Sequence, residues 1–524
     1  MRGVAVLAGL VLSTGAALAS PVFTEHAARL GIDHRYTGGW EHFVGGGVAV
    51  FDCDGDLLPE IYAAGGASPA ALLRNRSGDG RFNFENATPA ELALTGVTGA
   101  YPIDIDSDGR TDLAILRVGE NRLMRGLADC RFEPMDVGFQ SDAAWTTAFS
   151  ATWQDGDALP TLAFGNYVDR ADPDGPFRAC DKNRLYRPSG DRYGAPVALD
   201  PGFCALSMLF SDWNRNGVAD LRISNDRHYF VDGGSEQLWS VEAAPRLYEE
   251  ADGWRPVAIW GMGIASRDIS GDGLPEIFLT SMGDQKLHSL AKGAERPAYD
   301  DAPFSTGITA HRPYAGGDGR PSTGWHAEFG DIDNDGLDDL FIAKGNVEAM
   351  PGSAMKDPNN LLLQGADGVF SEHGDRAGLA SLERGRGAAL TDLDLDGRLD
   401  VVVLNRDAPL EIYRNDSPER GQWLLLRLEQ PAPNTQAVGA WIEVRTGSGT
   451  QVREVTIGGG HAGGSLGFQH FGLGQEAEAE VRVIWPDRTV TDWQRVDANA
   501  RLRLIRDAAD DFRQESAGSA TGNR

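Results

Sequence analysis

Apart from its first 20 residues, this chain of 524 residues lacks any apolar run long enough to cross a bilayer, which takes about 20 such residues. It also lacks a basic cluster. Its 77 acidic residues outnumber 48 basic ones, giving a formal charge of −29, and this argues against a nucleic-acid partner. Segments with helical periodicity are scarce, whereas 66 glycines and 26 prolines punctuate the chain, as all-β folds require. We therefore expect an all-β protein with no membrane span.

Motifs of catalysis are also missing. The sequence has no P-loop, no dinucleotide fingerprint after a strand and no haem attachment site. Residues 463–467 match G-x-S-x-G, but no helical pattern follows them, so they do not predict a nucleophile elbow. His461 and His470 lie nine residues apart without a metal-binding frame, and we interpret them as surface or packing residues. We predict no catalytic residue, and therefore a protein that is not an enzyme.

What the sequence does contain is a nine-residue acidic loop that returns seven times, at intervals of roughly 50 to 60 residues. The clearest copies read DIDSDGRTD, DIDNDGLDD and DLDLDGRLD. The seven acidic loops, called copies one to seven below, span residues 52–60, 104–112, 153–161, 212–220, 268–276, 331–339 and 392–400. A repeat at this period predicts an array of similar structural units.

The spacing of the acids predicts calcium, a hard cation that takes six to eight oxygen ligands. Positions 1, 3 and 5 would supply side-chain oxygens, position 7 a backbone carbonyl, and position 9 a closing acid. The predicted ligands are Asp52, Asp54, Asp56 and Glu60; Asp104, Asp106, Asp108, Arg110 and Asp112; Asp212, Asn214, Asn216, Val218 and Asp220; Asp268, Ser270, Asp272, Leu274 and Glu276; Asp331, Asp333, Asp335, Leu337 and Asp339; and Asp392, Asp394, Asp396, Arg398 and Asp400. We expect about five or six Ca²⁺ ions.

Two copies depart from the pattern. Copy three has Trp153 and Thr161 where the others have acids, so we expect a turn without metal there. Copy one has Leu57 at position 6, where the sharp turn favours glycine, and whether it binds metal stays open. Turn formers with solvated acids are the simple alternative for one such loop, but repetition in frame argues against that interpretation.

An EF-hand is excluded, because that loop needs a bidentate Glu at position 12 and a helix on each side. Position 12 is instead apolar, and the residues that follow each closing acid are short apolar runs such as LAILRV and VVVLNR. Runs of this kind are typical of buried strands. Each acidic loop is therefore predicted to be a tight turn between two strands.

A second pattern lies between the acidic loops. Segments such as ALLRNRSGDGRFNF and NLLLQGADGVFSE each predict a β-hairpin, which brings the repeat to four strands. Four-stranded units repeated around an axis form a β-propeller, and seven copies predict seven blades with all acidic loops at one rim. An elongated β-solenoid is the alternative, but its repeats are shorter. Residues 22–36 could supply a strand that closes the ring against the last blade.

The predicted domains are a signal peptide at residues 1–19, the propeller at 20–418, a small β-domain at 419–507 and a disordered tail at 508–524. The signal predicts a secreted or periplasmic protein, in which disulfides are allowed. Among the four cysteines, Cys180 and Cys204 are the preferred pair. Cys53 is either a small buried hydrophobe or a bridge to Cys130.

The acidic loops, with G-x-G or G-A-A before them, resemble the FG-GAP/VCBS repeats of integrin alpha chains and many exported bacterial proteins. The segment after residue 419 resembles the UnbV-type domain of the cartilage acidic protein family. The residues that carry this likeness are Trp423-Leu424, Val438-Gly439-Ala440, Gly458-Gly459-Gly460, Phe471-Gly472-Leu473-Gly474 and Trp485-Pro486-Asp487. Arg488 stands where family members usually have glycine. The resemblance implies a seven-bladed, integrin-alpha-like propeller, calcium and a place outside the cytoplasm, but little about activity.

We therefore expect an exported calcium-binding protein that acts as a protein or matrix interaction or adhesion module. Its partner would be an unidentified extracellular protein, matrix or glycan, bound on the face away from the acidic loops or in the central channel. One alternative is a carbohydrate-binding or carbohydrate-active propeller that uses Trp40, Trp145, Trp260 and Trp325, although packing between blades explains these residues equally well. Another is an accessory factor of an exported biosynthetic or redox system.

Overall fold

The computed structural model describes residues 20–78, 80–154, 156–175, 177–227, 233–242, 244–309, 311–418, 421–507 and 511–517. Strands dominate these residues, and the two α-helices, α1 (Ala27–Leu30) and α2 (Gly374–Ala377), are single turns. The predicted all-β class is confirmed. The predicted signal peptide lies outside the described residues. Of the helices in the described ranges, none has the length and apolar character needed to span a membrane.

Within the described residues, seven sheets carry the repeat, each with four antiparallel strands of its own, and the first is joined by a fifth strand from a distant segment; they are numbered here as their acidic loops are. Sheets one to three are β2 (Val48–Phe51), β3 (Glu60–Ala63), β4 (Ala71–Asn75) and β5 (Phe84–Asn86); β6 (Val97–Ile103), β7 (Asp112–Arg117), β8 (Arg122–Gly126) and β9 (Phe132–Pro134); and β10 (Thr146–Thr152), β11 (Thr161–Asn166), β12 (Asn183–Tyr186) and β15 (Val197–Leu199). Sheets four and five are β16 (Ala205–Ser211), β17 (Asp220–Asn225), β18 (Gln237–Ser240) and β19 (Arg246–Leu247); and β20 (Gly261–Arg267), β21 (Glu276–Ser281), β22 (Lys286–Leu290) and β23 (Tyr299–Asp301). Sheets six and seven are β24 (Gly324–Gly330), β25 (Asp339–Lys344), β26 (Asn360–Gln364) and β27 (Phe370–Glu372); and β28 (Arg384–Thr391), β29 (Asp400–Arg406), β30 (Glu411–Asn415) and β1 (Phe23–Glu25).

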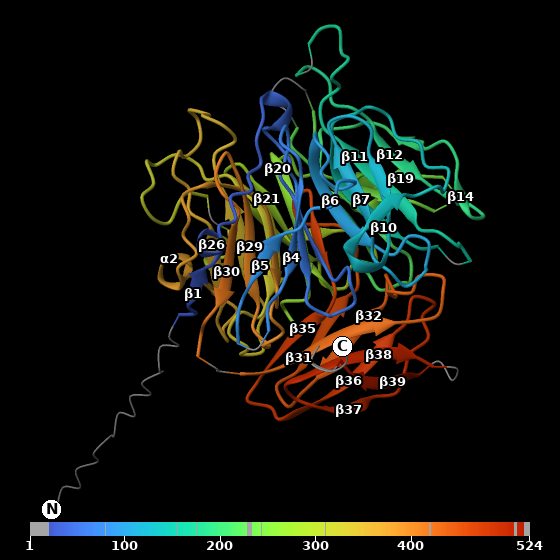
Figure 1. Cartoon of the computed structure of the whole chain (residues 1–524), viewed down its shortest axis with the longest axis vertical. Helices are drawn as coiled ribbons and strands as arrows, with labels where there is room; N and C mark the ends of the chain where they lie inside the picture. The colour runs from blue at the N-terminus through green and yellow to red at the C-terminus, as the bar shows by residue number, and fades with distance from the viewer. Residues whose placement is uncertain are drawn as a thin grey trace, which may run out of the picture.

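The first strands of the sheets surround a common axis. Each contacts the first strand of the next sheet, from β2 through β6, β10, β16, β20 and β24 to β28, and β28 contacts β2 again. These strands are rich in small or apolar residues, and β2, β6 and β10 are buried along their whole length, as expected for strands that are covered on both faces. Apolar clusters between neighbouring sheets form the core. We call this arrangement the ring (Figure 1).

The first strand of the described chain closes the last sheet. β1 pairs antiparallel with β30, with Phe23 opposite Asn415. The prediction that residues 22–36 supply such a strand is confirmed. Because the sheet joins the two ends of the repeat region, its backbone hydrogen bonds hold the ring shut.

A C-terminal domain of two further sheets packs on one side of the ring (Figure 1). One sheet contains β31 (Gln422–Glu429), β35 (Gln469–Gly474), β38 (Ala500–Arg506) and β39 (Phe512–Ser516); the other contains β32 (Trp441–Arg445), β33 (Thr450–Glu454), β36 (Glu478–Ile484) and β37 (Gln494–Asp497). Strand β39 lies in the predicted disordered tail, and that prediction is wrong for these residues. The strand pairs with β38 and buries Phe512, so the domain extends beyond residue 507.

A glycine-rich segment of this domain, residues 456–467, fills the centre of the ring, and we call it the central segment. Its short strand β34 (Gly464–Leu466) joins β2 in parallel. Gly459 and Gly460 donate backbone hydrogen bonds to carbonyls of sheets four and five, at 2.6 and 2.7 Å. The Tyr101 hydroxyl donates to the Gly459 carbonyl at 3.1 Å. The segment therefore lies in the central channel that the sequence analysis considered as a place for a partner, and binding of a partner there stays a prediction.

Two buried histidines fix the central segment. The backbone N–H of His461 donates to Nδ1 of His326, on β24, at 3.0 Å, and His461 Nδ1–H donates to the Met262 carbonyl at 2.9 Å. His461 Nε2 accepts the Gly45 N–H at 3.2 Å. Burial lowers the pKa of His461 to about 3, so its ring is neutral. His461 is thus a packing residue, as one of the sequence-based alternatives proposed, and it is fully satisfied.

We predict that the ring tolerates no side chain at Gly99, where its backbone meets the central segment. A Cβ added to Gly99, on β6, would lie 1.8 Å from the Ala462 carbonyl oxygen, so Gly99→Ala should destabilise the protein by about 1–3 kcal/mol. Gly194→Ala is the matched control, because a Cβ there would meet no atom within 4 Å. Denaturant unfolding measures both variants, and equal stability of the two would contradict the proposed seating of the segment.

Candidate metal centres

The acidic loops join the first and second strands of their sheets, as predicted, and six of them share one backbone shape. Position 6 has a positive φ in copies one, two, four, five, six and seven, at Leu57, Gly109, Gly217, Gly273, Gly336 and Gly397. Leu57 therefore keeps the turn despite its side chain, with φ 76°. Position 4 is also left-handed in all six copies, which the sequence analysis did not foresee because the residues there range from glycine to leucine.

Backbone amides hold the acids of positions 1 and 5 inward. In copy six, both oxygens of Asp331 accept N–H groups, from Asp335 at 3.0 Å and from Gly336 at 2.7 Å. The Asp335 carboxylate accepts the Leu337 N–H at 2.9 Å. Equivalent bonds recur in copies two, four, five and seven. The loops are therefore preorganised around their acids.

The closing acid at position 9 links the second strand of its sheet to the acidic loop and to the third strand. In copy seven, Asp400 accepts the Leu393 N–H at 2.9 Å and the Asn415 N–H at 2.7 Å. In copy six, Asp339 does the same for Ile332 and Gln364, both at 2.9 Å. An ion held by this acid would therefore connect the loop to the third strand of its sheet.

Four copies bring three carboxylates together, with ligand oxygens within 4.8 Å of one another. These groups are Asp52, Asp54 and Glu60; Asp104, Asp106 and Asp108; Asp331, Asp333 and Asp339; and Asp392, Asp394 and Asp400. Copies four and five do not form such a group among the described residues. In copy four, Asp220 instead accepts hydrogen bonds from Trp213 Nε1 and the Tyr248 hydroxyl, at 2.8 and 3.0 Å. Metal at copies four and five stays a prediction.

Burial makes these carboxylates costly to ionise without a cation. Burial first, and then the neighbouring acids, raises the pKa of Asp331 and Asp392 well above the ordinary value. The same two causes raise the pKa of Glu60 and Asp112 to about 8. A divalent ion would reverse this cost, because it favours the charged form of every acid around it.

Calcium fits the donor set. All the gathered atoms are carboxylate oxygens, which hard cations prefer. In copy seven, Asp394 Oδ1 is buried and has no hydrogen-bond partner, although Asp394 belongs to the three-carboxylate group. A buried acceptor without a donor is unfavourable unless a cation or water satisfies it. The predicted ligands of copies one, two, six and seven could thus hold the ion.

Arginines on the third strands were missed by the sequence analysis. The second-to-last residue of the third strand is an arginine in sheets one, two and seven: Arg74, Arg125 and Arg414. Each of these arginines forms an ion pair with the position-3 aspartate of the acidic loop in its own sheet. Leu363 stands at that place in sheet six. Because an arginine stands at this place in only some of the sheets, the sequence of a chain with 48 basic residues does not reveal that these arginines share a role.

Copy three differs as expected from its sequence. Trp153 packs against the apolar cluster between sheets two and three, and Thr161 is buried in β11. Asp155 lies outside the described residues. Copy three therefore has no acid at position 1 and none at position 9. That it binds no metal stays a prediction.

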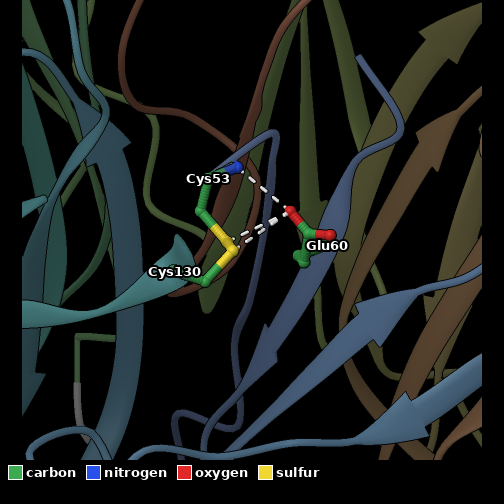
Figure 2. A group of neighbouring side chains, drawn as sticks. All are labelled: Cys53, Glu60 and Cys130. Carbon is green, nitrogen blue, oxygen red and sulfur yellow. Dashed lines mark hydrogen bonds between the residues drawn. A yellow bond between two sulfur atoms is a disulfide. The ribbon is translucent and has the colours of Figure 1, made fainter. Parts of the chain in front are cut away.

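Both cysteine pairs form disulfides, Cys53–Cys130 and Cys180–Cys204. The preferred pair is confirmed, and of the two alternatives for Cys53 the bridge is correct. Figure 2 shows that this bridge, which ties copy one to sheet two, lies against Glu60. Glu60 Oε2 accepts the Cys53 N–H at 3.0 Å and lies 3.1 Å from Cys53 Sγ. Two disulfides indicate folding in an oxidising environment.

The aromatic candidates divide into two kinds. Trp145 and Trp325 are 1% and 0% exposed, so packing explains them. Trp40 and Trp260 are only partly buried, at the edge of the same cluster. Ser465, in the G-x-S-x-G match, lies on β34 rather than on a strand-to-helix turn.

Comparisons with known proteins agree with this geometry. The FG-GAP-like repeat family matches residues 52–115 and 331–403, and the ASPIC and UnbV family matches residues 430–511. Cartilage acidic protein 1 of Mus musculus is 28% identical over 479 residues, covering 84% of this chain and 70% of that protein. The human protein of the same name is 29% identical over 165 residues, covering 30% of this chain and 24% of that protein.

Solved structures give weaker likenesses. The BP39L lectin from Burkholderia pseudomallei is 12% identical with a TM-score of 0.42, covering 71% of this chain and 97% of that chain. BBS1N, solved in complex with ARL6DN, is 10% identical with a TM-score of 0.42, covering 73% and 96%. By sequence, the chain therefore contains segments that match the FG-GAP-like repeat and the ASPIC and UnbV families in that order, and it is similar over most of its length to cartilage acidic protein 1.

Proposed function

We propose that this protein is an exported, calcium-stabilised β-propeller of seven blades that acts as a protein or matrix interaction module. The gathering of three carboxylates in each of four acidic loops carries the proposal. The seven sheets around one axis support the blade count. The two disulfides support an exported location. Calcium would supply the positive charge that lets these acids ionise while buried.

The partner surface in this proposal is the rim opposite the C-terminal domain. The acidic loops follow the first strands, so the turns between second and third strands emerge at the other end of the ring. At that rim Phe177 is 39% exposed, and its ring lies 5.2 Å from that of Trp40. The rim on the acidic-loop side and the centre of the ring are covered by the C-terminal domain and its central segment.

A carbohydrate ligand at the same rim is the second candidate function. Partly exposed aromatic rings stack on sugars as well as on protein side chains, and Trp40 with Phe177 offers such a surface. Aromatic stacking alone does not separate the two ligand classes.

We expect calcium to bind with at least four ions per chain and to raise the melting temperature strongly. At free calcium 100-fold above the dissociation constant, each site would add about 2.7 kcal/mol. Asp331→Asn should remove one ion, whereas Asp497→Asn, an exposed acid outside the loops, should remove none. Calorimetric titration and thermal unfolding of metal-stripped protein measure this. Fewer than two ions, or an unchanged melting temperature, would refute the calcium proposal.

The calcium effect should grow with pH. In the metal-free protein, burial raises the pKa of Glu276 to about 7 and that of Glu60 to about 8, above the values near 4 of an unfolded chain. The folded state then resists deprotonation, so metal-free stability falls as the pH rises from about 4 to 8. Calcium binds the ionised acids, and its gain in melting temperature should therefore be larger at pH 8 than at pH 5.

Thermal scans at both pH values, with sodium chloride of equal ionic strength as the control, test this. A metal-free protein whose melting temperature rises over the range, or a calcium gain that stays constant, would contradict the assignment of the buried acids.

The partner class is tested with a double variant, Trp40→Ala with Phe177→Ala, against the wild-type chain. Both proteins are used to capture partners from the native extracellular fraction and are applied to a glycan array. We expect the variant to capture at least about tenfold less of a protein or matrix partner than the wild-type chain does. Binding of wild-type protein to defined sugars, lost in the variant, would instead support the carbohydrate candidate. Unchanged capture by the variant would place the partner surface elsewhere.

A further inference from the structure

The C-terminal domain lies directly on the acidic loops, as the red sheets below the ring in Figure 1 illustrate. Residues of this domain hydrogen-bond or abut copies two, four, six and seven. Several of the residues they touch are predicted calcium ligands. The domain therefore shapes the sites as well as covering them.

In copy two, the contact is to the position-1 ligand. The Thr435 hydroxyl donates to Asp104 Oδ2, and the Asp104 N–H donates to Gln436 Oε1 at 3.0 Å. The Asn434 N–H donates to Ser107 Oγ at 3.0 Å. The Thr435 bond orients the Asp104 carboxylate from outside its own loop, where Gly109 already donates to the same oxygen at 2.9 Å. The other two bonds hold the backbone of Asp104 and the side chain of Ser107.

In copy six, the backbone itself makes the contact. A Cβ added to Gly472, on β35, would lie 1.8 Å from Asp331 Oδ2, so only glycine allows the domain to approach this ligand. The Gly474 N–H donates to the Asn334 carbonyl at 3.0 Å. Arg453, which is 3% exposed, donates to Asp338 at 3.0 Å, next to the closing acid of the loop.

Copies four and seven are held in the same way. Glu454 accepts the Asp212 N–H at 2.8 Å and the Ser211 hydroxyl at 2.6 Å. His470 Nε2–H donates to the Gly397 carbonyl at 3.2 Å in copy seven. All these residues lie on β33, on β35 or in the loop after β31, and the central segment lies between β33 and β35 in the sequence.

We propose that Gly472, Thr435, Gln436 and Glu454 are positioning residues for calcium, so that ion binding and docking of the C-terminal domain strengthen each other. This inference rests on the proposed calcium function. Linkage requires that a domain which holds the ligands in place raises calcium affinity, and that calcium in turn raises the affinity of the ring for the domain by the same factor. Loss of calcium would therefore loosen the central segment and open the centre of the ring.

The test uses the full chain and the variant Gly472→Ala, with Gly467→Ala as the matched control. Both glycines lie in the C-terminal domain and have φ values open to alanine, but a Cβ at Gly467 would meet no atom within 4 Å. Gly472→Ala should weaken calcium binding at one site by about five- to 100-fold, and Gly467→Ala should leave it unchanged. Thr435→Val, which removes only the hydroxyl that faces Asp104, keeps the test valid if Gly472→Ala misfolds.

Hydrogen exchange provides the reciprocal measurement. The Gly459 and Gly460 amides, bonded to ring carbonyls, should exchange at least about tenfold more slowly with calcium than without it, and this protection should shrink in Gly472→Ala. Wild-type calcium affinity in both Gly472→Ala and Thr435→Val would overturn the inference while leaving calcium binding intact. Exchange rates of the Gly459 and Gly460 amides that do not change with calcium would also overturn the inference. A wild-type chain that binds no calcium would instead overturn the proposed function, and this inference with it.

Discussion

Buried negative charge is the constraint on which the structure depends. The acidic loops place several carboxylates within 4.8 Å of one another, at the point where the first and second strands of a sheet meet. Backbone amides aim these acids inward but cannot neutralise them, and burial raises their pKa values well above the ordinary range. The metal-free chain can only protonate the acids or pair them with arginines such as Arg74 and Arg414. In the proposed function, a calcium ion would remove the conflict, because it would use the same acids as ligands.

The C-terminal domain connects the acidic loops, with their buried carboxylates, to the centre of the ring. Its central segment pairs with the first strands of the ring, and its neighbouring strands β33 and β35 touch the acidic loops. The centre of the ring, often available in a radial arrangement of sheets, is thereby closed from within. The partner proposed above would then bind at the opposite rim, where Trp40 and Phe177 lie.

The sequence predicted what depends on local spacing. The acid at every second position, the glycine at position 6, the hairpins and a closing strand within residues 22–36 all follow from short-range patterns, and the structure contains them. Contacts between distant segments could not be predicted in this way. Gly472 carries no sequence sign that it faces Asp331, 141 residues away by number (472 − 331), and Arg74 looks like any basic residue. Strand β39 was missed because its polar sequence is stabilised by pairing with β38 rather than by apolar periodicity.

The most direct test of the account is a crystal structure of the full chain grown in calcium, with anomalous scattering to locate the ions. The account predicts an ion in copies one, two, six and seven, each within about 2.3–2.6 Å of the gathered carboxylate oxygens. Density for water alone in these four loops at millimolar calcium, with the acids pointing apart, would contradict it.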